Sequence, residues 1–376
     1  MDLNNIRKEF PILEKTIYMN SCSLGALSRR SRQYVIDYLD LWDKMGASAW
    51  YEKWMSAIDD VRTMFATVLG ADASEIALGQ NISGLLSSLG SCFDFKDRNG
   101  IVITDMDFPT SNYQWLAKRE LGADIRIIES EDRIYIPEQE FERAIDNNTA
   151  IISTSHVFFL SGYIQDISKI NACARENNAL CIIDAYQSVG QVPVNVREMN
   201  IDVLLGGGLK WLLGGSGITF MYIKKELIKS LSPTITGWFG VKDQFSFGQT
   251  DFTYHDDARR FETGTPPVAA IVAARGGLEL VLEIGLENIW KMTKDITEEL
   301  IHELKKAGIK LRIPENSSDR SAIVMAVHPD PAPVVKALAE KNIIVDYRKD
   351  CIRISPYFYN NSEDVERFVK TLSELV

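Results

Sequence analysis

The stretch GGGLKW, residues 206–211, contains three glycines, a leucine and then a lysine, near the middle of the chain. Apolar residues precede it in IDVLL (201–205) and follow it in ITFMYI (218–223), and both patterns predict short strands. Glycine permits positive φ angles and the close approach of other groups. Lys210 is therefore expected on a tight connection between two strands, where functional side chains tend to be displayed.

Short apolar strands alternate with amphipathic helices upstream of this stretch. Two helices are predicted first, at roughly 30–45 and 51–69. The predicted strands that follow are EIALG, IVITD, DIRIIE, AIISTSHV and LCIIDA, which start at residues 75, 101, 124, 150 and 180. Alternation of this kind predicts βαβ units, a mostly parallel sheet and hence an α/β fold. In such sheets the ligand site lies beyond the carboxyl ends of the strands.

The alternation of strands and helices ends at about Thr265. A long helical run covers residues 266–308, and strands are predicted in SAIVMAV (321–327) and CIRIS (351–355). No repeat or low-complexity linker separates the two parts, so we expect two domains packed together. Their expected bounds are 20–265 for a large domain, and 1–19 together with 266–376 for a smaller α+β domain.

Composition excludes several classes of function. The 376 residues are 45% hydrophobic and 25% charged, as is usual for a globular protein, and the net charge of −11 argues against a nucleic-acid surface. No apolar run reaches the length of a membrane span, and the first residues lack the layout of a signal peptide. The five cysteines and four histidines are scattered, so we predict neither a metal site nor disulfides and expect a cytoplasmic location.

Asp184 and Lys210 carry the strongest chemical signal. Asp184 closes the most apolar strand, where a carboxylate is costly unless it pairs with a cation or caps a helix. Lys210 stands between LLGGGL and WLLGG, poor surroundings for the solvated side chain that most lysines have. A desolvated lysine becomes a nucleophile or a base. The pair suits pyridoxal phosphate (PLP), which a lysine holds as a Schiff base while a carboxylate keeps the pyridine nitrogen protonated.

PLP also needs a site that binds its phosphate, and the segment LGQNISGLL (78–86) is a candidate for it. This segment joins a predicted strand to a helix, and backbone N–H groups at a helix N-terminus bind phosphate well. An ordinary helix cap by Asn81 or Ser83 is the alternative. Phe108 also follows a predicted strand, in DFPTSNYQW (107–115), and its ring either stacks on a planar group or belongs to the core.

Taken together, these stretches resemble the class-V, fold-type-I PLP enzymes over nearly the whole chain. That group includes cysteine desulfurases, selenocysteine lyases, kynureninases, cystine C–S lyases and proteins similar to isopenicillin N epimerase. The most specific match is IIDAYQSVGQVPVNVREMNIDVLLGGGLKWLLGGSG, residues 182–217. The resemblance implies a large domain built on a mostly parallel, seven-stranded type of sheet flanked by helices, with a smaller α+β C-terminal domain.

The resemblance also assigns roles within the site. Lys210 becomes the Schiff-base lysine, Asp184 the partner of the pyridine nitrogen, and Gln187 a hydrogen-bond donor to the phenolic oxygen of the cofactor. Phe108 matches the position of the ring-stacking residue. The residues that match the phosphate loop are Asn81, Ile82 and Ser83.

Two further roles concern the substrate and a second subunit. CIRISPYFYN (351–360) resembles the motif whose arginine clamps the substrate carboxylate, and Arg353 takes that place. A guanidinium suits this role because its planar fork matches a carboxylate, although without the resemblance Arg353 would be expected at the surface. RFETGTPP (260–267) resembles the segment that reaches the phosphate of the neighbouring subunit through Thr265. The resemblance thus implies an obligate homodimer with shared active sites and an amino acid as substrate.

Departures from the family pattern reduce the number of reactions that the chain is expected to catalyse. Cys351 lies two residues before Arg353 and resembles the start of a strand, unlike the mobile loop cysteine of desulfurases. Phe159 stands where several desulfurases have an asparagine, and Ser111 where kynureninases usually have an aspartate. We expect a PLP-dependent lyase of the cysteine/cystine C–S lyase or cysteine desulfurase-like type. The alternatives are a kynureninase-like hydrolase, or a class-V aminotransferase or epimerase for another amino acid.

Competing classes of protein lack their motifs. A nicotinamide dehydrogenase needs the motif G-x-G-x-x-G directly after its first strand, and this motif is absent there. A nucleotide hydrolase of the P-loop type needs G-x-x-x-x-G-K-[ST], which the sequence does not contain. A binding module that had kept only the fold would be expected to lose Lys210 or Asp184, and both are present. The sequence leaves open whether His156, Trp238 or Cys351 takes part in the reaction.

Overall fold

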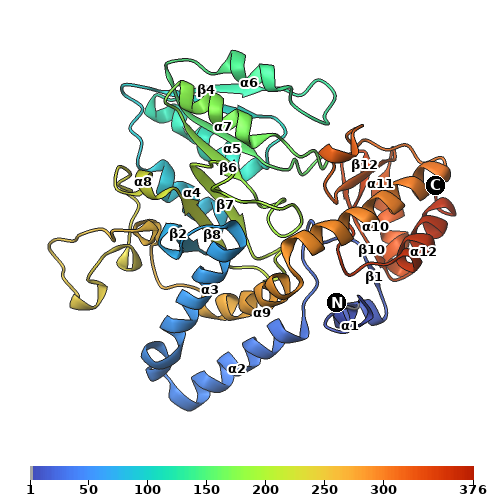
Figure 1. Cartoon of the computed structure of the whole chain (residues 1–376), viewed down its shortest axis with the longest axis horizontal. Coiled ribbons are helices and arrows are strands. Elements are labelled where there is room, and N and C mark those ends of the chain that lie inside the picture. Colours follow the sequence, from blue (N-terminus) through green and yellow to red (C-terminus); the bar gives the residue numbers. More distant parts are fainter. Residues whose placement is uncertain (1–2) are drawn as a thin grey trace.

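A seven-stranded sheet forms the centre of the protein (Figure 1). The computed structural model describes residues 3–376. The strand order is β2-β8-β7-β6-β5-β3-β4, and every neighbouring pair is parallel except the two that involve β8. The strands are β2 (Ile76–Gly79), β3 (Gly100–Thr104), β4 (Asp124–Ile128), β5 (Thr149–Ser155), β6 (Leu180–Asp184), β7 (Val203–Gly207) and β8 (Thr219–Ile223). The predicted mostly parallel α/β sheet is confirmed.

Helices cover both faces of this sheet, which is why its central strands are nearly continuous apolar runs. The helices that connect its parallel strands are α4 (Ile82–Gly90), α5 (Pro109–Leu116), α6 (Glu138–Ala144) and α7 (Ile167–Glu176), and the short α8 (Lys225–Ile228) follows β8. The early helices predicted at 30–45 and 51–69 are confirmed as α2 (Arg29–Met45) and α3 (Met55–Leu69), with a π-helical turn (Trp50–Trp54) before α3. Both pack against α9 (Val268–Ile284).

The glycines of the GGGLKW stretch serve close packing. A Cβ added at Gly206 would lie 2.5 Å from the ring of Phe220, and one at Gly207 would lie 2.5 Å from the ring of Tyr186. Neither glycine has a positive φ angle, so the close-approach explanation holds and the conformational one does not. The strand before Lys210 therefore lets the neighbouring Tyr186 ring lie directly against its backbone.

The helical run predicted over 266–308 is two helices, not one. α9 ends at Ile284 and α10 (Leu286–Lys306) begins two residues later. Gly285 separates them with φ of +85°, a conformation that favours glycine and that a continuous helix does not contain. The break redirects the chain from the helices beside the large sheet toward the small sheets (Figure 1).

Two small sheets and their helices form the other part of the molecule (Figure 1). β1 (Ile17–Tyr18) pairs in parallel with β10 (Ile343–Ile344), so the segment after α1 (Leu3–Arg7) joins the C-terminal part. A three-stranded antiparallel sheet contains β9 (Val324–Val327), β12 (Cys351–Ile354) and β11 (Asp346–Arg348), and α11 (Pro331–Glu340) and α12 (Ser362–Ser373) complete this part. The strands predicted in SAIVMAV and CIRIS are confirmed, while the domain bounds stay a prediction.

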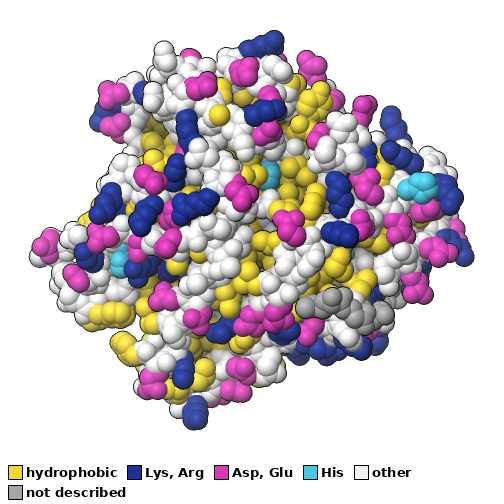
Figure 2. Space-filling model, in the orientation of Figure 1, with side chains coloured by type: hydrophobic (Ala, Val, Ile, Leu, Met, Phe, Trp, Pro, Cys, Tyr) yellow, Lys and Arg dark blue, Asp and Glu magenta, His cyan; other side chains and the backbone are white. Residues whose placement is uncertain are grey.

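The chain has a net charge of −11, yet both signs of charge occur on its surface. Acidic and basic side chains are interspersed over the face seen in Figure 2, with hydrophobic side chains between them near its centre. Within residues 3–376, no helix is both long and apolar enough to cross a bilayer. In the same described part of the chain, no three side chains of His, Cys, Asp or Glu are grouped so that they could hold a metal ion.

Candidate functional site

A cavity of about 310 Å³ lies where the predicted site residues converge, beyond the carboxyl ends of the parallel strands. Its walls come from five segments: the loop after β2, the loop after β3, the end of β5 with the loop that follows, the end of β6, and the segment between β7 and β8. The predicted residues that line it are Asn81, Ile82, Ser83, Phe108, Asp184, Gln187 and Lys210. Thr265 and Arg353 are not among its lining residues.

Lys210 lies on the connection between β7 and β8, as predicted, and its amine is buried. Burial lowers the pKa of Lys210 to about 8, against the opposing influence of Cys22 and Asp184 and with a further lowering by Arg353 and Arg348. Its Nζ lies 4.6 Å from the centre of the Tyr186 ring and 5.7 Å from that of Phe108. The side chain is therefore placed as a nucleophile or base and not as a solvated surface cation.

Asp184 ends β6 with its carboxylate buried beneath this cavity. Burial raises its pKa, while a hydrogen bond from the Tyr186 backbone N–H (2.9 Å to Oδ1) and the charge of Lys210 lower it. The helix-cap alternative is wrong, because no helix lies between β6 and β7. The other carboxylate oxygen has only a long contact of 3.4 Å with the Ser111 hydroxyl, so it can still accept a strong hydrogen bond from a cationic group.

The segment after β2 is a capped helix start that opens onto the cavity, and its anion-binding role stays a prediction. Asn81 is the N-cap of α4, and its side-chain oxygen accepts a hydrogen bond of 2.8 Å from the Gly84 N–H. Ile82 and Ser83 are the first residues of the helix and line the cavity. The first N–H groups of a helix have no intrahelical partner and carry the positive end of its dipole, so they attract an anion into this cavity.

Phe108 is not a core residue, because 44% of its surface is exposed at the cavity. Its ring meets that of Phe159 edge to face, with centroids 5.3 Å apart. The preceding residue, Asp107, anchors the loop: its buried carboxylate accepts hydrogen bonds from the Thr104 N–H (3.0 Å) and the Ser155 N–H (2.6 Å). This anchor joins the ends of β3 and β5 and holds the Phe108 ring over the cavity.

Gln187 is held by two hydrogen bonds that the sequence did not reveal. Its Nε2 donates to the Cys22 carbonyl oxygen (3.0 Å), and its Oε1 accepts from the Trp211 indole N–H (3.0 Å). The loop that contains Cys22 follows β1 and lies against the Lys210 connection, since the Gly25 N–H donates to the Leu209 carbonyl (2.9 Å).

This N-terminal loop is a part of the site that the sequence analysis missed. A Cβ at Gly25 would lie 2.1 Å from the Lys210 carbonyl oxygen, so only glycine fits there. The small residues of NSCSLG (20–25) were the available signal. Nothing in the pattern indicated that a segment so far from Lys210 in sequence would pack on it.

Arg353 is buried on β12, with 2% of its surface exposed, so the surface expectation is wrong. Its Nη2 donates to the Ser23 hydroxyl (2.7 Å) and to an Asp346 carboxylate oxygen (2.9 Å). Its Nη1 makes a long contact of 3.4 Å with the Phe159 carbonyl oxygen. Arg353 does not line the cavity itself, but Phe159, which its Nη1 contacts, is part of the cavity wall.

Thr265 lies in a different environment from the other predicted residues. It is exposed and borders a separate cavity of about 220 Å³ whose other walls are mostly aromatic. Those walls are Trp50, Tyr51, Met55, Trp238, Phe239 and Phe245. Within one chain, Thr265 therefore does not join the cavity of Lys210, and its contact with a neighbouring subunit stays a prediction.

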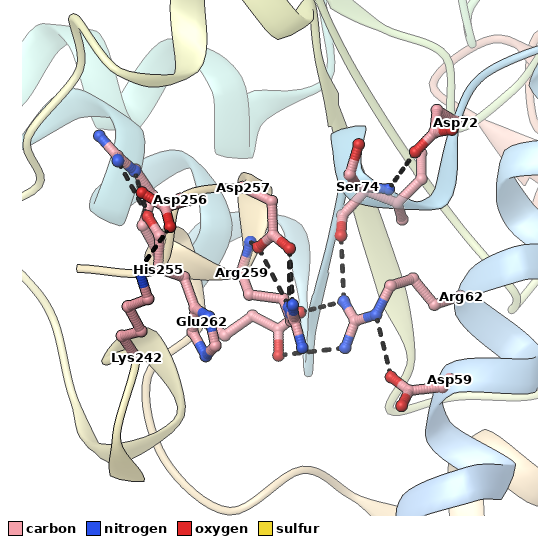
Figure 3. A network of polar contacts seen from close by, with 12 residues as sticks. Asp59, Arg62, Asp72, Ser74, Lys242, His255, Asp256, Asp257, Arg259 and Glu262 are labelled. Atoms are coloured by element: carbon pink, nitrogen blue, oxygen red, sulfur yellow. Dashed lines mark hydrogen bonds and ion pairs between the residues drawn. The ribbon is translucent and has the colours of Figure 1, made fainter.

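The segment before Thr265 is anchored by a buried ion pair (Figure 3). Arg62 of α3 pairs with Glu262, and the same Glu262 carboxylate accepts a hydrogen bond of 2.9 Å from the Leu78 N–H. Arg62 also donates to the Ile76 carbonyl oxygen (3.0 Å). These bonds fix the segment to β2, the strand that leads into the start of α4.

His156, Trp238 and Cys351 differ in their relation to the site. Burial lowers the pKa of His156 to about 4, so its ring is neutral, while its backbone N–H donates to the Asp184 carbonyl (2.9 Å). Burial also raises the pKa of the Cys351 thiol to about 11, on a strand rather than a loop. Trp238 is 41% exposed beside Thr265 and donates its indole N–H to the Gln244 carbonyl (2.6 Å).

Comparisons with known proteins agree on one family. The family model described as Aminotransferase class-V matches residues 30–368. The chain is 31% identical over 371 residues to the uncharacterized aminotransferase YcbU of Bacillus subtilis (strain 168), covering 98% of this chain and 96% of that one. It is 27% identical over 394 residues to the kynureninase of Bacillus thuringiensis subsp. konkukian (strain 97-27), covering 100% of this chain and 92% of the relative.

A solved structure shares the fold. The complex between the cystine C–S lyase C-DES and its reaction product cysteine persulfide superposes with a TM-score of 0.90. The alignment covers 97% of this chain and 99% of that one at 19% sequence identity. At this identity the likeness shows the arrangement of the chain, and the reaction has to be argued from the side chains of the site.

Proposed function

The chain belongs to the aminotransferase class-V family of PLP-dependent enzymes, and from this premise we propose that it is a lyase acting on an α-amino acid, of the cystine C–S lyase or cysteine desulfurase-like type. One observation carries the proposal. A buried, easily deprotonated lysine, a buried carboxylate and a helix N-terminus line a single cavity of about 310 Å³.

The residues present fit PLP. The cavity has the size of a small cofactor site, and its three polar features match the three ends of the molecule. The N–H groups at the start of α4 would hold the phosphate, Asp184 the pyridine nitrogen, and Lys210 the aldehyde carbon. Phe108 would cover one face of the ring. The free acceptor capacity of Asp184 is what a protonated pyridine nitrogen needs.

When bound, PLP supplies an electron sink for charge that develops at the α-carbon of the substrate. The residues of the chain supply the rest. Asp184 keeps the proton on the ring nitrogen, and the Lys210 amine removes the proton from the substrate Cα. Arg353 binds the substrate carboxylate and so fixes which bond at Cα is presented for cleavage.

Two features favour β-elimination over transfer of sulfur to a protein thiol. Cys351 is buried at the start of β12, so it lacks the mobility that a sulfur-accepting cysteine requires. The C–S lyase with the same fold releases cysteine persulfide as its reaction product. For a cystine substrate, cleavage between Cβ and sulfur would likewise yield cysteine persulfide, pyruvate and ammonia, with water consumed in the last step.

Two other reactions remain as second candidates because named relatives support them. The kynureninase relative favours hydrolysis at Cγ, although Ser111 stands where that group usually has an aspartate. The YcbU relative favours transfer of the amino group to a keto acid. Both reactions would use Lys210 and Asp184 in the same positions, so these residues do not separate them from β-elimination.

A homodimer with shared active sites is part of the proposal. Thr265 is exposed on the chain that carries it and lies outside the cavity of Lys210, as a residue that serves a second subunit would. The surface around it exposes large aromatic side chains, which monomeric proteins rarely gather in one place. These residues are Tyr51, Trp238, Phe245 and Phe247.

Product identification tests the reaction type. Purified holoenzyme is incubated with L-cysteine, L-cystine and L-kynurenine, and the products are identified by mass spectrometry. We expect pyruvate from a sulfur amino acid, as β-elimination requires. Alanine as the product would overturn β-elimination, because it shows that Cα has kept its amine, as in a desulfurase or a kynureninase. Amino-group transfer to an added keto acid would identify an aminotransferase.

A further inference from the structure

Arg353 is already ion-paired within the chain. Its Nη2 donates to Asp346 Oδ2 (2.9 Å) and to the Ser23 hydroxyl (2.7 Å), and Ser23 in turn donates to the same Asp346 oxygen (2.9 Å). The three side chains form a closed ring of hydrogen bonds. Asp346 begins β11, the strand that pairs with β12, so the hairpin places the carboxylate beside the guanidinium.

The ring of hydrogen bonds leaves one part of the guanidinium free. Nη2 has two hydrogens and two acceptors, so its donors are used. The Nε–H is buried and finds no acceptor among residues 3–376, and Nη1 has only the 3.4 Å contact with Phe159. Buried donors without a good acceptor are costly, and the weakly bonded Nη1 lies beside Phe159 of the cavity wall, where a ligand oxygen can complete its hydrogen bonds.

The charges of the cluster point to the same ligand. Arg348 also pairs with Asp346 Oδ2 (2.8 Å), so two guanidinium groups share one carboxylate in the described part of the chain. One positive charge stays uncompensated, beside the unused donors of Arg353. The cluster is thus matched to a ligand that brings one further carboxylate.

Resting on the proposed function, we infer that Asp346 and Ser23 are positioning residues for Arg353. They hold its Nη2 end so that Nη1, beside Phe159 of the cavity wall, stays available for the carboxylate of the amino-acid substrate, and Arg348 balances Asp346 once that carboxylate is bound. Ser23 links this arrangement to the Lys210 connection, because the loop that carries it also bonds to Gln187 and Leu209. Asp346 therefore acts on the affinity for the carboxylate, and not on the chemistry at Cα.

Pairs of ligands that differ only in a carboxylate show how much this group contributes to binding. The visible absorbance of the holoenzyme is titrated with L-cysteine and cysteamine, and with L-alanine and ethylamine, so that each amino acid is compared with the amine that lacks its carboxylate. In Asp346→Asn we expect the Kd of the amino acids to rise about tenfold, the loss of one charge-assisted contact, and that of the amines to change less than about twofold. Ser23→Ala should also raise the Kd of the amino acids, by a smaller factor than Asp346→Asn.

Asp350→Asn is the matched control. Asp350 lies next to β12 in the same hairpin and pairs with Arg312 instead of Arg353, so its loss should leave both sets of Kd values unchanged. Unchanged or tighter binding of the amino acids by Asp346→Asn would overturn the inference, since tighter binding would mean that Asp346 competes with the substrate. Equal weakening of amino acids and amines would also overturn it, because general damage to the fold has that signature.

The wild-type enzyme separates failure of this inference from failure of the proposed function. If the wild type binds amino acids no better than the matched amines, Arg353 does not hold a substrate carboxylate, and the role of Asp346 fails with it. If no amino acid changes the absorbance of the wild-type cofactor, the proposed function itself is wrong. If the wild type prefers the amino acids and Asp346→Asn keeps that preference in full, only the inference about Asp346 is wrong.

Discussion

The amine of Lys210 lies 4.6 Å from the centre of the Tyr186 ring, and the same ring packs against the backbone of Gly207. The end of the strand before the lysine therefore packs against Tyr186, two residues after Asp184. This contact removes Lys210 from water on one side and fixes its distance from the end of β6. The reactive amine and the buried carboxylate are thus held by one packed unit, on which the first three predictions rest.

Lys210→Ala should abolish covalent attachment of the cofactor and lower turnover by about 1,000-fold or more, since a positioned general base contributes roughly 10²–10⁴-fold. The visible absorbance of the bound cofactor and the rate of product formation measure the two effects. Lys229→Ala, which removes a side chain that is 74% exposed, is the control and should match the wild type. Wild-type turnover in Lys210→Ala would contradict the assignment of Lys210 as the Schiff-base lysine and general base.

The lowered pKa of Lys210 predicts how cofactor attachment depends on pH. Burial lowers this pKa from 10.5 to about 8, and only the deprotonated amine is a nucleophile. The rate of PLP attachment to the apoprotein should therefore rise with pH and level off above about 8. Stopped-flow absorbance across a series of buffers gives the profile. A midpoint near 10.5 would show that the amine is solvated, contrary to the structure.

Gly207→Ala should disturb the site through packing alone. The new methyl group would lie 2.5 Å from the Tyr186 ring, so the ring has to move, at a cost of about 1–3 kcal/mol in the free energy of unfolding. Because Tyr186 lies against Lys210, the absorbance of the bound cofactor should shift as well. Gly248→Ala is the control, since the atom nearest to a Cβ there is 3.7 Å away, an ordinary contact. Equal thermal unfolding of the two variants would contradict this account.

The sheet and the cavity were largely predictable from sequence because both are local features. The apolar runs define all seven strands, and the order of elements brings Asp184, Lys210 and the start of α4 to one edge. Only the family resemblance favoured a place for Phe108 at the cavity, which it lines, because an aromatic ring after a strand fits a core equally well. The two-helix break at Gly285 was missed, because a glycine within a helical pattern is often tolerated.

Contacts between distant segments were not predictable. Ser23 and Asp346 meet Arg353 because β1 pairs with β10 and because the β11–β12 hairpin turns back on itself. No periodicity in the sequence encodes these pairings. The burial of Arg353 follows from them, which is why a surface position was the natural expectation for a lone arginine. A charged pair on separate segments becomes visible only once the topology is known.

The Arg62–Glu262 pair should contribute to stability far more than a surface pair. Glu262→Ala leaves Arg62 and the Leu78 N–H buried without their partner, so we expect a loss of about 3–5 kcal/mol in the free energy of unfolding. Glu14→Ala breaks an ion pair with Arg29 in which both side chains are more than half exposed, and it should cost less than about 1 kcal/mol. Urea unfolding of both variants tests the difference; equal midpoints would contradict it.

Cys351→Ala separates a lyase from a desulfurase that uses a protein thiol. Cys351 is fully buried, and burial raises the pKa of its thiol to about 11, so it is expected to pack as a small apolar side chain. Turnover of L-cysteine by this variant should stay within about twofold of the wild type, while stability falls by about 1 kcal/mol through the lost sulfur volume. Sulfur release and pyruvate formation, measured together, check this. A loss of sulfur release of 100-fold or more in a correctly folded variant would identify Cys351 as the sulfur acceptor and would replace the lyase by a desulfurase.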